Sequence, residues 1–158
     1  MLALLLAAVH YLGSPLFDRL FPPAPPTVVE PVNTRFFRCG QGHGPNCVVD
    51  GDTFHIGPRR IRVAGIDAPE LHPARCPDEA RLGEAAAARL LALLNQGPFT
   101  LTSPSAAAFD EYGRELRSVT RTGADGKVWT IADAMIASQT VRPFLRGQRG
   151  TWCPVAAP

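Results

Sequence analysis

The stretch CVVDGDTFHIGPRRIRVAGIDAPE, residues 47–70, contains the pattern that decides the fold. It begins with a strand over 47–50, an Asp-Gly turn and a second strand over 53–56. A Gly-Pro turn then leads into a third strand over 60–66. Because short turns join consecutive strands, the pattern predicts a meander of three neighbouring strands.

Downstream of the meander, apolar residues at helical spacing predict an amphipathic helix over 81–95, which Gly97 and Pro98 end. A polar loop over 68–78 precedes this helix. Two further strands are expected over 99–102 and 115–122, then a turn over 124–126 and a short helix over 131–138. The fold class expected is α+β, with a five-stranded OB-type Greek-key β-barrel and two to three helices. The pattern alone leaves other α+β folds open.

The 158-residue chain divides into three parts by composition. Residues 1–20 are expected to be an N-terminal export segment or membrane anchor, because residues 1–12 are almost wholly apolar and the apolar stretch continues, with breaks, to Phe17. Residues 21–33 are proline-rich and are expected to form an extended linker. Residues 34–154 are expected to form a single OB-type domain.

The apolar N-terminal segment is not a standard signal peptide, because no Lys or Arg precedes it and no clean cleavage site follows. It extends to Phe17, and about 17 residues is the lower limit for a membrane span. Either the true start lies upstream or the segment is a short uncleaved anchor. A buried N-terminal helix is the structural alternative.

Composition does not decide the function. The net charge of +2 is too small to indicate a nucleic-acid binder by itself. Nearly all cationic residues are arginine, with Lys127 the sole lysine. Arginine suits bidentate phosphate contacts, but a compositional bias explains its abundance equally well.

The four cysteines form an even set without a CxxC pair, so two disulfides are favoured over a zinc site. Disulfides form in oxidising compartments, and the expected export segment would deliver the chain to one. An extracytoplasmic location is therefore expected: periplasmic, secreted, or anchored to the membrane by the N-terminus.

Four acidic residues gather at the ends of strands that the meander makes neighbours: Asp50, Asp52, Asp67 and Glu70. Carboxylates and backbone carbonyls are the ligands that Ca²⁺ prefers. Taken alone, the Asp-Gly-Asp segment is more simply explained as a hairpin turn. Arg62 and Arg114 make the set more specific, because phosphodiester hydrolysis needs positive charge to offset the charge that grows on the phosphate oxygens.

Three motifs, VVDGDT (48–53), RVAGIDAPE (62–70) and DEYGR (110–114), occur in this order around the predicted helix. Together they resemble the thermonuclease family typified by staphylococcal nuclease. The resemblance covers residues 47–141, and the coincidence of three motifs is far more specific than any one of them.

The resemblance implies a role for each matched residue. Asp52, Asp67 and the Ala68 carbonyl would bind Ca²⁺ directly, and Asp50 would act through water. The remaining matched residues act on the substrate: Glu70 on the attacking water, Arg62 and Arg114 on the scissile phosphate, and Tyr112 in the nucleotide site.

Three positions depart from the family pattern. Ala68 replaces a threonine, but it keeps the backbone carbonyl that would contact the metal ion. Glu111 replaces a lysine beside the nucleotide phosphate, and residues 138–144 lack the glycine that usually ends the second helix. The last two departures bear on substrate affinity.

The cysteines are expected to support this site. Cys39 and Cys47 bracket a short glycine-rich loop, and Cys76 could reach Cys153 in the tail, so the pairs Cys39–Cys47 and Cys76–Cys153 are expected. His55 and His72 lie near the motifs, but a strand or surface position is favoured for both over a ligand role.

The function expected is that of a calcium-dependent extracytoplasmic endonuclease that hydrolyses the phosphodiester bonds of DNA and RNA, with single strands preferred. The chain is expected to be a monomer. The alternative is a non-catalytic OB-type module that binds nucleic acid or protein. A calcium-binding structural domain would explain the acids but not Arg62 and Arg114.

Overall fold

The structure is a computed structural model that describes residues 28–40, 44–103, 108–145 and 150–154. The expected export segment and residues 21–27 of the expected linker lie outside these ranges.

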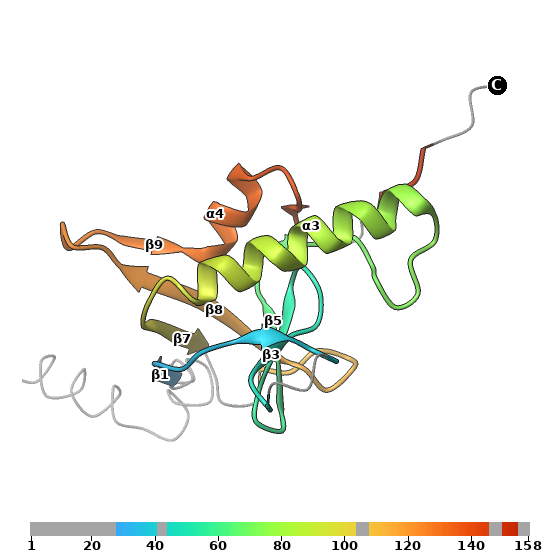
Figure 1. Cartoon of the computed structure of the whole chain (residues 1–158). Helices are drawn as coiled ribbons and strands as arrows, with labels where there is room; N and C mark the ends of the chain where they lie inside the picture. The colour runs from blue at the N-terminus through green and yellow to red at the C-terminus, as the bar shows by residue number, and fades with distance from the viewer. Residues whose placement is uncertain (1–27, 41–43, 104–107, 146–149, 155–158) are drawn as a thin grey trace, which may run out of the picture.

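Most of the described strands form one mixed sheet in the order β1-β7-β8-β5-β4-β3-β2, and β9 pairs with β8. A small second sheet pairs β6 with β10. The described residues contain two helices (Figure 1). The elements are β1 (Val28–Val32), β2 (Phe37–Arg38), β3 (Cys47–Val48), β4 (Thr53–Ile56), β5 (Arg59–Val63), β6 (Ile66–Asp67), α3 (Pro77–Leu94), β7 (Phe99–Ser103), β8 (Glu115–Thr122), β9 (Val128–Thr130), α4 (Ile131–Ala137) and β10 (Arg142–Pro143).

The α+β class is thus as predicted, but the sheet is larger than five strands. Among the described residues, no pairing joins β1 to β2, so the two ends of the sheet stay apart. The antiparallel meander β3-β4-β5 follows the prediction, and β5 then pairs in parallel with β8.

The third predicted strand is divided in two. β5 ends at Val63, and Ile66–Asp67 forms β6, which pairs with β10 in the second sheet. Gly65 has φ 86, a left-handed conformation that glycine adopts without steric cost, and it turns the chain between the two strands. This turn carries Asp67 away from the edge of the main sheet.

The expected linker over 21–33 overlaps the sheet, so the expected start of the domain at residue 34 is too late. Val28–Val32 forms β1 and pairs along its full length with β7. Pro31 is tolerated because β1 is an edge strand, where one side of the backbone needs no partner. Glu30 also binds Arg59 of β5 through two bonds of 2.7 and 2.9 Å, which ties this strand to the domain.

Helix α3 begins at Pro77, four residues before the predicted start. Cys76 is the N-cap, and its Sγ accepts a hydrogen bond from the Glu79 amide. Pro77 fits the first helical position, and Asp78 and Glu79 place negative charge in the first turn. The N-terminal signals therefore lie within the segment that the sequence analysis assigned to a loop.

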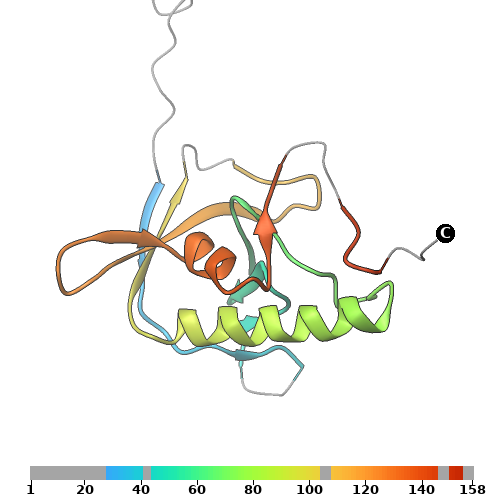
Figure 2. The same ribbon diagram turned by 90° about the horizontal axis from the view of Figure 1, so that it is seen from above.

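The core lies between the sheet and α3, which runs alongside the sheet with α4 beside it (Figures 1 and 2). Three phenylalanines, Phe36, Phe54 and Phe99, meet at its centre with ring centroids 5.5 to 6.2 Å apart. Helix α3 contributes Ala86, Ala87, Leu90, Leu93 and Leu94 to this core.

The chain turns after helix α4 without the help of a glycine, because residues 138–144 contain none. Gln139 has φ 59, in the left-handed region. Gln139→Gly should therefore raise the free energy of unfolding by about 1 kcal/mol, because glycine adopts this conformation without a Cβ clash. Urea unfolding of the two proteins measures the difference. Gln96→Gly, which follows α3, is the matched variant. An equal effect of Gln139→Gly and Gln96→Gly would contradict the prediction.

Candidate active site

One cleft of about 680 Å³ brings together the three motifs. It is formed where the turn between β3 and β4, the segment that follows β6 and the loop before β8 meet. All eight residues assigned from the resemblance line it: Asp50, Asp52, Arg62, Asp67, Ala68, Glu70, Tyr112 and Arg114.

The Asp-Gly-Asp turn is shaped by contact with α3. A Cβ on Gly51 would lie 2.5 Å from the Cβ of Ala86 and 2.9 Å from that of Ala68. Glycine is therefore required here by close packing. The turn is closed by an Asp50 carboxylate oxygen, which accepts from the Asp52 amide at 3.0 Å. This packing fixes two carboxylates at one end of the cleft.

Arg62 reaches the same carboxylates from β5. Its Nη1 forms an ion pair with Oδ2 of Asp52, and its Nη2 donates to the Ile66 carbonyl at 3.2 Å. Burial disfavours the charged guanidinium, but attraction to Asp52 outweighs it and raises the pKa of Arg62. Arg62 is therefore a permanent cation inside an acidic site.

Asp110, the first residue of the DEYGR motif, orients the rest of that motif. One of its oxygens accepts from the Tyr112 and Arg114 amides at 3.0 and 2.9 Å, and the other binds Arg114 Nε at 2.6 Å. Burial opposes ionisation, but these hydrogen bonds hold the pKa of Asp110 below its ordinary value. Arg114 in turn donates to the Thr53 hydroxyl at 3.3 Å, and Thr53 donates to Asp52 at 2.8 Å.

Asp67 is bound by an arginine that sequence reasoning missed. Arg142 of β10 donates to Asp67 Oδ2 from Nε at 2.9 Å and lies 2.8 Å from it through Nη2. The same Nη2 donates to the Gly150 carbonyl, and the guanidinium stacks on Trp152. Arg142 thus links the acid cluster to the C-terminal tail.

That tail is fastened to the start of α3. Both expected disulfides are present, Cys39–Cys47 and Cys76–Cys153. The second joins two sites 77 residues apart and holds residues 151–154 beside the first turn of α3 (Figure 2). Residues 150 and 152 consequently line the cleft.

Glu70 lies on the segment between β6 and α3, and a buried glutamate holds that segment in place. Glu79 is fully buried and accepts from the Arg75 amide at 2.6 Å and the Arg75 guanidinium at 2.5 Å. Hydrogen bonds from the Arg75 side chain are the main cause that lowers the pKa of Glu79 to about 2, and the Glu70 backbone adds to them. The Glu70 side chain itself is exposed to the cleft.

Replacing Glu79 by glutamine should lower the free energy of unfolding at neutral pH by about 2 kcal/mol, because charge-assisted hydrogen bonds are lost. The folded-state pKa of about 2 lies below the ordinary value of 4.5, so this contribution is complete above pH 4.5. It is lost as the pH falls through the folded-state value. Urea unfolding from neutral to acid pH should show the two proteins converge. A difference that stays constant across this range would contradict the assignment.

The acid cluster suits a hard cation. Burial, with repulsion from Asp52 and Glu70, raises the pKa of Asp50 to about 7. Carboxylates from two segments and the Ala68 carbonyl are the oxygen donors that Ca²⁺ takes, without a requirement for strict geometry. The donor set therefore fits calcium, although Asp52 and Asp67 each use one oxygen for an arginine.

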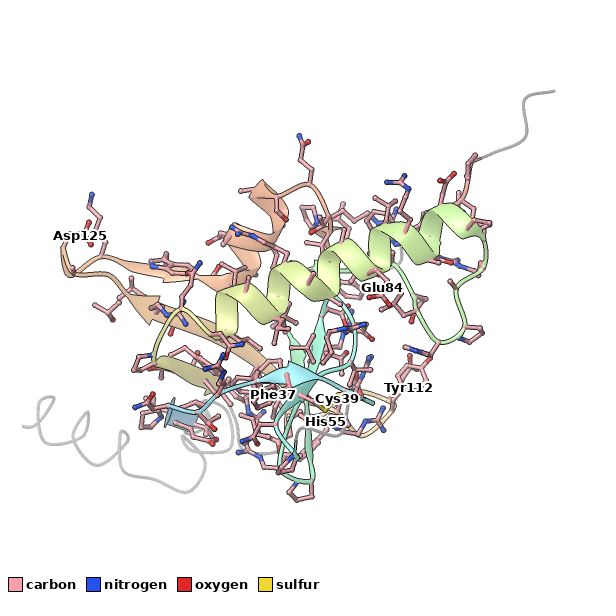
Figure 3. All side chains as sticks on the ribbon, viewed as in Figure 1. Phe37, Cys39, His55, Glu84, Tyr112 and Asp125 are labelled. Carbon is pink, nitrogen blue, oxygen red and sulfur yellow. A yellow bond between two sulfur atoms is a disulfide. The ribbon has the colours of Figure 1, made fainter. Side chains whose placement is uncertain are left out.

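A second group of metal-ligand types lies beside the first disulfide. Among the described residues, the ligand atoms of Cys39, Cys47 and His55 lie within 4.8 Å of one another (Figure 3). Both sulfurs are joined in the disulfide, so they could act as thiolate ligands only after reduction. His55 and His72 also line the cleft, and burial lowers the pKa of His55.

Sequence reasoning missed four residues of the site: Thr53, Asp110, Arg142 and Trp152. Thr53 follows Asp52 directly, and Asp110 and Gly113 are turn-forming residues at the two ends of one turn, so the first two had a local signal. Arg142 lies 75 residues from Asp67, and neither it nor Trp152 belongs to any of the motifs.

No family model matches the chain, and no curated protein matches it significantly. The two disulfides point to an oxidising, extracytoplasmic environment. Of the helices in the described part of the chain, none has both the length and the apolar character to cross a bilayer.

Proposed function

We propose that this chain is a calcium-dependent extracytoplasmic endonuclease that hydrolyses phosphodiester bonds of DNA and RNA. The observation that carries the proposal is the convergence of three separate motifs, with four carboxylates and two arginines, in one cleft. We also propose that the fold is an OB-type Greek-key barrel. Barrels of this type are partly open, so they do not require every pair of neighbouring strands to be hydrogen-bonded. The meander and the parallel return of β8 beside β5 support that proposal.

Asp52, Asp67 and the Ala68 carbonyl would hold Ca²⁺, with Asp50 acting through water. When bound, the ion would offset the negative charge that develops on the phosphate oxygens. Arg62 and Arg114 bind the scissile phosphate, and Arg62 exchanges its contact with Asp52 for the phosphate as substrate enters. Both guanidiniums are already turned toward the acid cluster, through Asp52 and Thr53.

Glu70 accepts the proton of the attacking water. The water oxygen forms the new bond to phosphorus, the bond between phosphorus and the 5′ oxygen breaks, and that oxygen leaves and takes up a proton. The products carry a 3′ phosphate and a 5′ hydroxyl. Exposure of Glu70 to the cleft allows water to reach its carboxylate.

The test is incubation of the protein with single-stranded DNA in calcium, compared with its Glu70→Gln variant. The wild-type protein should give shorter products that end in 3′ phosphates. The variant should bind the same DNA but cleave it at least 10²-fold more slowly, because it lacks a proton acceptor. Binding by the wild-type protein without cleavage would instead favour the non-catalytic OB-type module.

A further inference from the structure

Trp152 is placed where it can contact substrate. It is half-buried and lines the cleft that holds the acid cluster. Its ring lies over the Arg142 guanidinium, whose Cζ is 4.2 Å from the ring centroid. The neighbouring Cys153 is joined to Cys76, so the backbone beside the indole is tied covalently to the start of α3.

Arg142 fixes the orientation of this ring. Its guanidinium donates to Asp67 at 2.9 Å and to the Gly150 carbonyl at 2.5 Å. The plane of the guanidinium is thereby set by β6, β10 and the tail together. Trp152 stacks on a support that is already held in position, which limits the entropy that it loses on binding a ligand.

The other aromatic residue of the cleft has the same arrangement. Tyr112 lies 5.3 Å from the Cζ of Arg114, and Arg114 reaches Asp52 through the Thr53 hydroxyl. One aromatic–arginine pair therefore approaches the acid cluster at Asp52, and the other at Asp67.

We propose that Trp152 stacks on a second nucleobase, that of the nucleotide across the scissile phosphate from the one that Tyr112 contacts. This inference rests on the proposed function. Two aromatic rings in one cleft, each held near a different acid of the same cluster, fit an unpaired strand of at least two nucleotides, because bases in a duplex are not free to stack on protein. Stacking accepts any base, so the site should show little sequence preference.

Fluorescence can follow this contact, because Trp129 and Trp152 are the only two tryptophans in the chain. Trp129 lies on β9 against Arg121, 5.3 Å from its Cζ, and Trp129→Phe leaves Trp152 as the sole reporter. In a Glu70→Gln background with calcium, which prevents cleavage, thymidine dinucleotide and longer oligothymidylates should quench its emission. Thymidine 5′-monophosphate should bind with little quenching. Equal quenching by the monophosphate, or none by the bound dinucleotide, would overturn the assignment.

Affinity measurements separate a stacking role from a structural one. Trp152→Ala should weaken dinucleotide binding about tenfold, while Trp152→Phe restores most of it, since stacking contributes roughly 1–3 kcal/mol per base. Affinities for calcium and for the monophosphate should stay unchanged. If Trp152 only supported Arg142, both of those would weaken in parallel, which would refute the proposal. Failure of the unaltered protein to bind any nucleotide in calcium would instead refute the proposed function.

Discussion

Replacing Arg62 or Arg114 by lysine should lower the turnover of single-stranded DNA about 10²–10³-fold, the range typical for loss of one transition-state donor. Lysine keeps the charge but lacks the planar fork that binds two phosphate oxygens at once. Both side chains are largely buried and held by acidic or hydroxyl partners, so an ammonium on a flexible stem would not occupy the same positions.

The measurement is steady-state cleavage of a single-stranded oligonucleotide, with turnover and KM separated. Most of the loss should fall on turnover, because the contacts strengthen as charge develops on the phosphate. Arg89→Lys, on the exposed face of α3, is the matched control and should cleave at the wild-type rate. Wild-type turnover in both Arg62→Lys and Arg114→Lys would show that the assigned active site is wrong, even with the fold intact.

Local signals explain the parts of the fold that the sequence predicted. Gly57 and Pro58 separate β4 from β5, and the apolar spacing of α3 marks its buried face, so both followed from the pattern. The division of the third strand did not, because its cause is the left-handed conformation of Gly65 and the pairing of β6 with a strand near the C-terminus. Strand β1 was missed because proline normally argues against a strand, whereas an edge position accepts it.

The candidate site also contains residues that the sequence could predict and residues that it could not. The motif residues could be placed together because the ends of adjacent strands lie close in space. Their partners could not be predicted, since the contact between Arg142 and Asp67 depends on how the chain returns after α4. The disulfide pairing could be predicted, because Cys39 and Cys47 bracket a short loop and only Cys76 and Cys153 were then left to pair. The link from Cys153 to the cleft through Trp152 required the three-dimensional structure.

Removal of calcium should abolish cleavage, because Arg62 and Arg142 offset only part of the negative charge of Asp50, Asp52 and Asp67 beside an anionic substrate. Cleavage in EDTA should fall below detection and return on addition of calcium. Magnesium should restore little activity, since it demands a tighter octahedral site and gives up its water reluctantly. Full cleavage in EDTA would refute the assignment of a calcium enzyme.

Asp67→Asn tests whether this metal dependence arises from the assigned ligands. The change removes one negative charge from the site, and its calcium affinity should fall about 10²-fold, because ligand charge sets affinity in such sites. It also weakens the contact with Arg142, so circular dichroism should confirm that the fold is kept. Asp125→Asn, an exposed acid in the turn between β8 and β9, is the matched control and should bind calcium with wild-type affinity in calorimetry. If Asp67→Asn and Asp125→Asn bound calcium with equal affinity, the ion would lie elsewhere. Neutralising a carboxylate that binds the ion must weaken its electrostatic attraction to the ion.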